Sequence, residues 1–137
     1  MRRAPTGRSV AQQALALRAR YPEGRVDLRR GRLTWTGRLT PTSLSRTYAV
    51  EVRYRDRSFP QVRVLEPELD SRLGESLPHV YREGTLCLHL RNDWFPSMSI
   101  ADSIVPWSAE WLAFYEIWKA TGDWHGGGEW PPAAPSD

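Results

Sequence analysis

The chain has 137 residues, 40% of them hydrophobic, which is the size of one ordinary domain that folds without disulfide bonds. Its formal net charge of +3 is too small to indicate nucleic acid as a partner. The sequence has no run of about 20 apolar residues and no apolar secretion signal at its N-terminus, so we expect a cytoplasmic protein that does not contact membranes.

The first predicted element is a helix over residues 9–20. Ser9 is a suitable N-cap residue, and the apolar residues Val10, Ala14, Leu15 and Leu17 follow at near-helical spacing. A Tyr-Pro-Glu-Gly sequence then ends the helix.

Residues 25–66 alternate between apolar and polar side chains, which predicts four strands joined by short turns. Short turns favour an antiparallel meander with one face on the core and the other in water. Glu51, Arg53 and Arg55 would line the wet face. Few aromatic residues accompany these arginines, so a solvated face is favoured over a nucleic-acid surface. The alternating apolar residues are Val26, Leu28, Leu33, Trp35, Leu39, Tyr48, Val50, Val52, Tyr54, Val62 and Val64.

A long irregular stretch leads to Gly84 and then to the compact apolar segment 85–88, which contains Cys87. Loops held by a rigid scaffold carry most reactive groups, so we expect the chemistry here. Cys87 is the only cysteine, which excludes an intrachain disulfide and fits a reducing compartment. Cys87 is either an unreactive packing residue or a nucleophile.

The segment 99–102 resembles a helix capping box, and we expect Pro106 to kink or restart the helix that follows. Aromatic residues then recur at steps of three and four. This stripe is interpreted as packing across the sheet, the alternative being a groove for a partner helix. Its members are Trp107, Trp111, Phe114, Tyr115 and Trp118.

Gly122 should end this helix, and a Gly/Pro-rich loop and tail follow over residues 122–137. We therefore expect a single domain over residues 1–137 with its core at about 9–121.

A cysteine attacks as its thiolate, so its neighbours decide its use. If residues 86–89 are extended, Cys87 and His89 point to the same side about 7 Å apart. We predict no cofactor, and no metal site, because the candidate ligands have no standard spacing. Those ligands are His79, Cys87, His89 and His125. The sequence has no phosphate loop or dinucleotide fingerprint, so we expect no activating domain and a thioester supplied from outside.

The order of these features resembles that of ubiquitin-conjugating enzymes. That family reads His-Pro-Asn, then Gly-x-Ile-Cys-Leu, then Trp-x-Pro and an apolar helix start. The corresponding residues here are His79-Val80-Tyr81, Gly84-Thr85-Leu86-Cys87-Leu88, Trp94-Phe95-Pro96 and Ile100. The tail after Thr121 looks like that of the stand-alone conjugating-enzyme-like proteins of bacterial CBASS anti-phage operons.

The resemblance implies an α+β fold of the ubiquitin-conjugating (UBC) type, with an N-terminal helix, a four-stranded antiparallel meander, a cysteine-bearing loop and C-terminal helices packed on the sheet. It implies that Cys87 forms a thioester with the C-terminus of a partner protein, expected to be a cGAS-like cyclic-oligonucleotide synthase. The acyl group would then pass to an amine on a target protein.

The resemblance also suggests roles around Cys87. Position 79 is histidine where the family motif has an asparagine credited with stabilising the oxyanion, so His79 is either the oxyanion donor or a structural residue. Asp93 would orient the incoming amine or be solvated, and Trp94, with Pro96, would shape the wall or pack the loop down. The segment His125, Gly126, Gly127 either approaches the substrate tail beside Cys87 or is a connector.

Two other functions remain open from the sequence. The first is a non-catalytic adaptor on the same fold that binds the synthase, although retention of Cys87 argues against it. The second is a redox sensor, which would need a thiol of lowered pKa and would form no acyl adduct.

Overall fold

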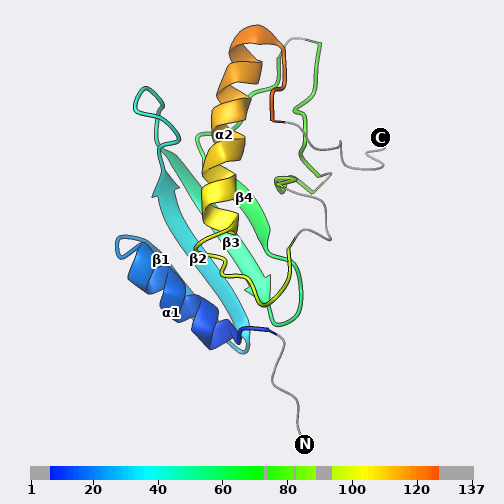
Figure 1. Ribbon diagram of the computed structural model, residues 1–137. Helices are drawn as coiled ribbons and strands as arrows, with labels where there is room; N and C mark the ends of the chain where they lie inside the picture. The colour runs from blue at the N-terminus through cyan, green and yellow to red at the C-terminus, as the bar shows by residue number, and fades with distance from the viewer. Residues whose placement is uncertain (1–6, 73, 82, 89–93, 127–137) are drawn as a thin grey trace, which may run out of the picture.

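The computed structural model describes residues 7–72, 74–81, 83–88 and 94–126. A four-stranded antiparallel sheet forms its centre, and Figure 1 shows both helices in front of this sheet. In chain order the elements are α1 (Val10–Arg20), β1 (Arg25–Arg29), β2 (Arg32–Leu39), β3 (Tyr48–Arg55), β4 (Gln61–Glu66) and α2 (Ile104–Thr121). The predicted N-terminal helix and four-strand meander are confirmed, whereas the UBC assignment and the domain bounds stay predictions.

Helix α1 begins where the sequence predicts. Ser9 is its N-cap, and a full capping box joins the Ser9 and Gln12 side chains to each other's backbone N–H groups. The buried residues Val10, Ala14 and Leu17 form the face that packs on the sheet. Leu15, which the spacing groups with these residues, is 64% exposed, so the predicted apolar face holds at three of its four positions.

The sheet has the order β1-β2-β3-β4, and every neighbouring pair is antiparallel. Alternate residues of β3 are buried, and Arg53 and Arg55 on the other face are exposed. The Arg53 Nε lies 2.9 Å from a carboxylate oxygen of Glu51 on that same face. Alternation therefore predicts correctly which face of the sheet is wet.

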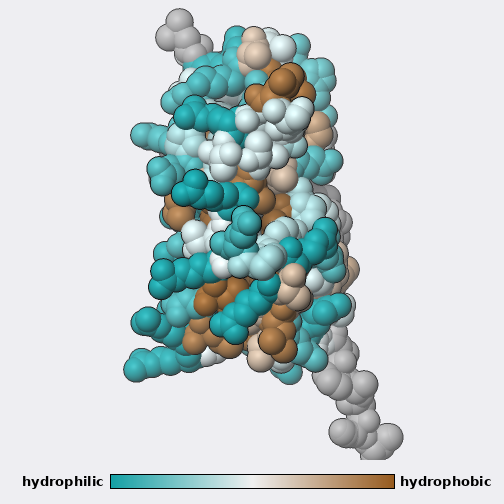
Figure 2. All heavy atoms as spheres, turned by 90° about the vertical axis from the view of Figure 1, so that its left-hand side faces the viewer, coloured by the Kyte–Doolittle hydropathy of each residue, from teal (hydrophilic) through white to brown (hydrophobic). Residues whose placement is uncertain are grey.

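The side of the molecule that carries α1 and β1 is mainly hydrophilic, with separate hydrophobic patches between the polar side chains (Figure 2). No helix in the described part of the chain is long and apolar enough to cross a bilayer.

The capping box predicted at residues 99–102 forms only in part: the Ser99 hydroxyl accepts from the Asp102 N–H (3.3 Å), in a turn that precedes the helix. Helix α2 begins at Ile104 with Ser103 at the N-cap position, and Ser103 makes no side-chain cap bond. Its hydroxyl instead donates to the Ser99 carbonyl (2.6 Å) and accepts from the Trp94 indole N–H (3.0 Å). Asp102 pairs with Arg20. The Ser99 half of the predicted box is thus present, whereas the Asp102 side chain is bound by a tertiary partner.

Pro106 neither kinks nor restarts α2. It is the third residue of the helix, where a backbone N–H has no partner within the helix, so proline removes no hydrogen bond. The helix then runs unbroken to Thr121, and among the described residues after Cys87 it is a single helix, where the resemblance implies several. Trp111, Tyr115 and Trp118 are buried, as the packing interpretation of the aromatic stripe expects.

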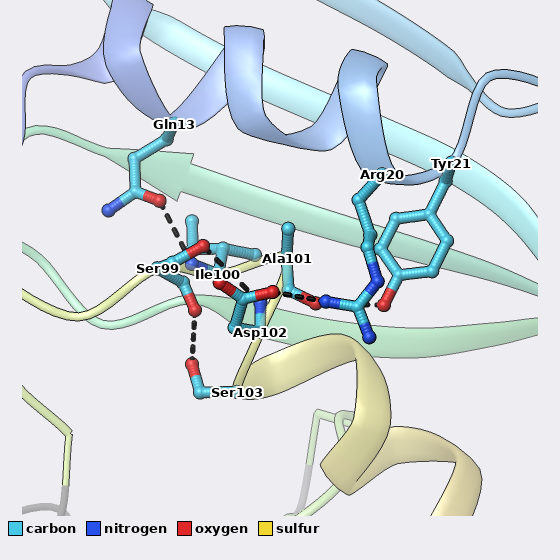
Figure 3. Close-up of polar contacts among 8 residues, drawn as sticks. All are labelled: Gln13, Arg20, Tyr21, Ser99, Ile100, Ala101, Asp102 and Ser103. Atoms are coloured by element: carbon cyan, nitrogen blue, oxygen red, sulfur yellow. Dashed lines mark hydrogen bonds and ion pairs between the residues drawn. The ribbon is translucent and has the colours of Figure 1, made fainter.

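A buried glutamine joins α1 to the chain that precedes α2 (Figure 3). Gln13 is 0% exposed; its amide N–H donates to the Met98 carbonyl (2.8 Å), and its amide oxygen accepts from the Ile100 N–H (2.9 Å). An ion pair between Arg20 and Asp102 and a bond from the Tyr21 hydroxyl to the Ala101 carbonyl continue the same junction. Residues 98–102 are therefore fixed through side chains of α1 and the residue after it.

Candidate active site

Cys87 lies on a short hairpin attached to the edge of the sheet. The Leu86 N–H donates to the Val62 carbonyl of β4 (2.9 Å), so segment 85–88 continues the sheet beyond its last strand. Within the hairpin, Cys87 donates its N–H to the carbonyl of His79 (2.8 Å), and Tyr81 donates to Thr85 (2.8 Å). The predicted irregular stretch is thus ordered at its end, and it holds the cysteine backbone against β4.

The turn of this hairpin depends on glycine. Gly84 has a φ of +93°, a conformation that side-chain-bearing residues rarely adopt, and its N–H donates to the Tyr81 carbonyl (2.8 Å). The glycine of the Gly-x-x-Cys-Leu motif therefore has a structural role, because it closes the turn that positions Cys87.

Cys87 is partly exposed, although its preceding neighbours Thr85 and Leu86 are buried. Leu86 belongs to the main hydrophobic core and anchors the segment there. The Cys87 side chain is therefore not fully buried in the core, and its backbone is held by hydrogen bonds of the hairpin. The prediction that the thiol sits on a rigid scaffold at the surface matches this placement.

His79 is 4% exposed and has a φ of +54°, an unusual value for a residue other than glycine. Its carbonyl accepts two hydrogen bonds, from the Cys87 N–H and from the Trp111 indole N–H (3.2 Å). Its ring stacks on the indole of Trp124 at 4.9 Å between centroids and 23° between planes. His79 thus positions Cys87 through its backbone, and an oxyanion role for its ring stays a prediction.

Trp124 is a part of the site that sequence reasoning missed. Besides stacking on His79, it contacts Trp111 (5.4 Å between ring centroids) and Phe114 (6.1 Å) of α2. It therefore joins the helix to the residue that holds Cys87. The only signal in the sequence is an aromatic residue shortly after the helix end, which does not by itself indicate a partner.

Replacing Trp124 with alanine should lower the free energy of unfolding by about 2 kcal/mol, because a half-buried indole and its ring contacts are lost. It should also slow acylation of Cys87, because His79 loses its stacking partner. Trp124→Phe keeps a ring and should recover most of both properties. Urea unfolding and intact-mass acylation rates measure the two effects; an alanine variant equal to wild type in both would contradict the role.

The remaining predicted site residues fall into two groups. Trp94 is buried (1% exposed) and lies edge-on to Tyr54, with 5.6 Å between ring centroids, while Pro96 is partly exposed and accepts a backbone bond from Arg8. His125 is exposed, and Gly126 packs so closely that an added Cβ would lie 2.7 Å from the Trp124 Nε1. His89, Asp93 and Gly127 lie outside the described residues.

The close approach that we expect of the glycines is thus made at Gly126 to the chain's own Trp124 and Phe114. Among the described residues, no group of three or more histidine, cysteine or acidic side chains could hold a metal ion.

The fold and this hairpin define the class of the protein: an α+β domain whose single cysteine is held, partly exposed, at the edge of an antiparallel sheet. The model of the family described as "Type II CBASS E2 protein" matches residues 13–131, which is most of the chain, so the chain belongs to that family. Membership makes it an E2-like component of the CBASS anti-phage system, where it acts with other CBASS components. No curated protein matches the chain.

Proposed function

We propose that the chain is a cysteine-dependent conjugating enzyme of the bacterial cytoplasm, which carries the C-terminus of a partner protein as a thioester on Cys87. The observation that carries this proposal is the placement of Cys87 on a glycine-closed hairpin at the sheet edge, in a chain of the E2-like family. Because the attachment is rigid, less entropy is lost when the thiol is aligned with an acyl group.

The proposed reaction has two transfers. The Cys87 thiolate attacks the carbonyl of an activated C-terminus, the S–C bond forms, and the activating group leaves with its electron pair. An amine of the target protein then attacks the thioester, an amide bond forms, and the thiolate leaves. The C-terminus must arrive activated, because a thiolate does not displace oxide from a free carboxylate.

The partner that we propose is a cGAS-like cyclic-oligonucleotide synthase, and the acceptor is a second protein. We also propose that His79, His89 and Asp93 act in catalysis at Cys87. Substrate positioning is proposed for Trp94, Pro96, His125, Gly126 and Gly127.

Lys119 is the only lysine of the chain and therefore its only side-chain amine. Its ammonium group donates to the Asp70 carboxylate, which raises the pKa of Lys119 and lowers that of Asp70. A raised pKa keeps more of the amine protonated at any given pH, so Lys119 is a poorer nucleophile than an unpaired lysine. This favours an acceptor on another protein over self-modification.

Asp70→Asn should therefore speed acylation of Lys119 about threefold, because the loss of one exposed ion pair changes an equilibrium by roughly this factor. Peptide mapping after limited reaction with an acetylating ester near pH 9 would measure this, with the N-terminal amine of the same chain as internal reference. Asp123→Asn is the matched control, since the Asp123 carboxylate pairs with no described cation. An unchanged ratio of Lys119 to N-terminal acetylation in Asp70→Asn would contradict the coupling.

The proposed function is tested by purifying the chain from cells that express the complete CBASS operon, followed by intact-mass analysis. We expect an adduct with the mass of a partner protein, which reductant removes and which Cys87→Ala lacks. Absence of any reductant-sensitive adduct, with every partner present and the operon protecting the cells, would refute the thioester.

A further inference from the structure

A groove of about 800 Å³ runs beside the cysteine hairpin. One wall consists of residues where β2 begins and β3 ends, and the other of residues from the hairpin. Leu86 and Leu88, the two neighbours of Cys87 in the chain, both line it. A ligand in this groove therefore lies against the segment that carries the thiol.

The groove has an unusual charge arrangement. Arg32 and Arg55 face each other directly across the β2–β3 pair, both are exposed, and both line the groove. Like charges at directly opposite positions destabilise a sheet. Neither arginine forms an ion pair with any residue in the described ranges, whereas the neighbouring Arg53 is paired with Glu51. An anionic ligand between Arg32 and Arg55 would relieve their repulsion.

The rest of the lining suits a peptide. Phe59 is 39% exposed and lies with Pro60 in the turn between β3 and β4, and Leu88 adds a partly buried apolar side chain near Cys87. A peptide with both acidic and apolar side chains matches this combination of charge and apolar surface.

A nucleic acid fits the same surface less well. The groove also contains the carboxylate of Glu83, which accepts a hydrogen bond from Thr85 (2.8 Å). A peptide can place its few carboxylates at the arginines and away from Glu83, whereas a phosphate backbone carries a charge at every nucleotide. The chain carries a formal net charge of only +3. Electrostatic binding to nucleic acid depends on many neutralised phosphates, which two free arginines do not provide.

We propose that this groove binds an acidic segment of the carried protein, immediately upstream of the C-terminal residue that is joined to Cys87. The inference rests on the proposed function and adds its substrate class: a C-terminus preceded by Asp or Glu residues together with apolar ones. Arg32 and Arg55 bind the carboxylates, and Leu86 and Leu88, on either side of Cys87 in the chain, contact the apolar side chains of the peptide.

The test uses the full chain and three synthetic thioesters: a Glu/Leu hexapeptide ending in Gly-thioester, the same peptide with Gln in place of Glu, and an acetylglycine thioester without any peptide. In each reaction the Cys87 thiolate attacks the thioester carbonyl, a new S–C bond forms, and the small thiol leaves with the electron pair of the broken bond. Intact-mass analysis at low ionic strength gives the rate of acyl transfer.

We expect the acidic peptide to load about tenfold faster than the neutral one, and high salt to remove most of this difference. Arg32→Glu/Arg55→Glu should abolish the preference, each peptide rate being divided by the acetylglycine rate of the same variant. The control Arg18→Glu/Arg25→Glu makes the same change in net charge outside this groove and should keep the preference.

The outcomes separate the two proposals. If acetylglycine does not load Cys87, the proposed function fails. If acetylglycine loads but acidic and neutral peptides load equally, the function survives and the groove assignment is overturned. Fluorescence anisotropy with Cys87→Ala adds a second arm: tighter binding of a single-stranded RNA oligonucleotide than of the acidic peptide would overturn the peptide assignment in favour of nucleic acid.

Discussion

Cys87→Ala should abolish anti-phage protection and lower the formation of conjugates by about 1,000-fold or more, because the substitution removes the atom that forms the acyl bond. Cys87→Ser should instead accumulate an ester with the partner, because an oxygen ester reacts with amines far more slowly than a thioester. Plaque assays and gel analysis with and without reductant measure both effects. The serine adduct should resist the reductant that cleaves the wild-type one.

The alanine substitution at a partly exposed position should leave the fold intact. Its unfolding midpoint in urea provides the control, and we expect it to be close to that of wild type. A folded alanine variant that protects cells fully would contradict catalysis and support the adaptor function.

Gln13→Ala should give the largest loss of stability among single polar substitutions in the described part of the chain. The side chain is fully buried and satisfies two backbone groups, at Met98 and Ile100. Removing it leaves both groups unsatisfied, at a cost of about 3 kcal/mol in the free energy of unfolding. For a chain of this size, we expect the melting temperature to fall by about 10 °C.

Gln12→Ala is the matched control, because it removes the same side chain one residue earlier, from an exposed bond of the capping box. Its cost should be about 1 kcal/mol or less. Calorimetry and urea unfolding measure both variants. Equal effects of the two substitutions would mean that the buried junction of α1 with residues 98–100 adds no more to stability than the exposed capping bond of Gln12.

The parts of the fold that local patterns determine were predictable. Ser9 is the N-cap that the sequence predicts, and alternation over residues 25–66 gives the four strands and the wet side of β3. In both cases the signal lies within a few residues of the element, and the tertiary structure agrees with it.

The parts that depend on distant partners were not predictable. The Ser-x-x-Asp pattern at residues 99–102 suggests a capping box at a helix start, but only the Ser99 half forms, in a turn before α2, and the Asp102 side chain binds Arg20 instead. The hairpin that holds Cys87 depends on the pairing of Leu86 with Val62, which lies 24 residues earlier in the chain. Local periodicity does not report such a contact.

The candidate site likewise has residues that the sequence identifies and contacts that it does not. The motif identifies Cys87, and the resemblance draws attention to His79. The structure adds how they are joined: through the His79 carbonyl, which also binds Trp111, and through the stacked ring of Trp124. Trp124 lies after the end of α2 and belongs to no periodic pattern of apolar residues, so only the three-dimensional structure reveals its contacts.

The most direct test of the account follows acyl transfer to Cys87 in the native chain and in the same chain unfolded in urea, with acetylglycine thioester as the donor near neutral pH. We predict one adduct at Cys87, formed faster in the folded protein than in urea, since the hairpin holds the sulfur ready for an acyl group. An adduct that forms only after unfolding would show that the fold shields this thiol, and it would contradict the proposed catalysis.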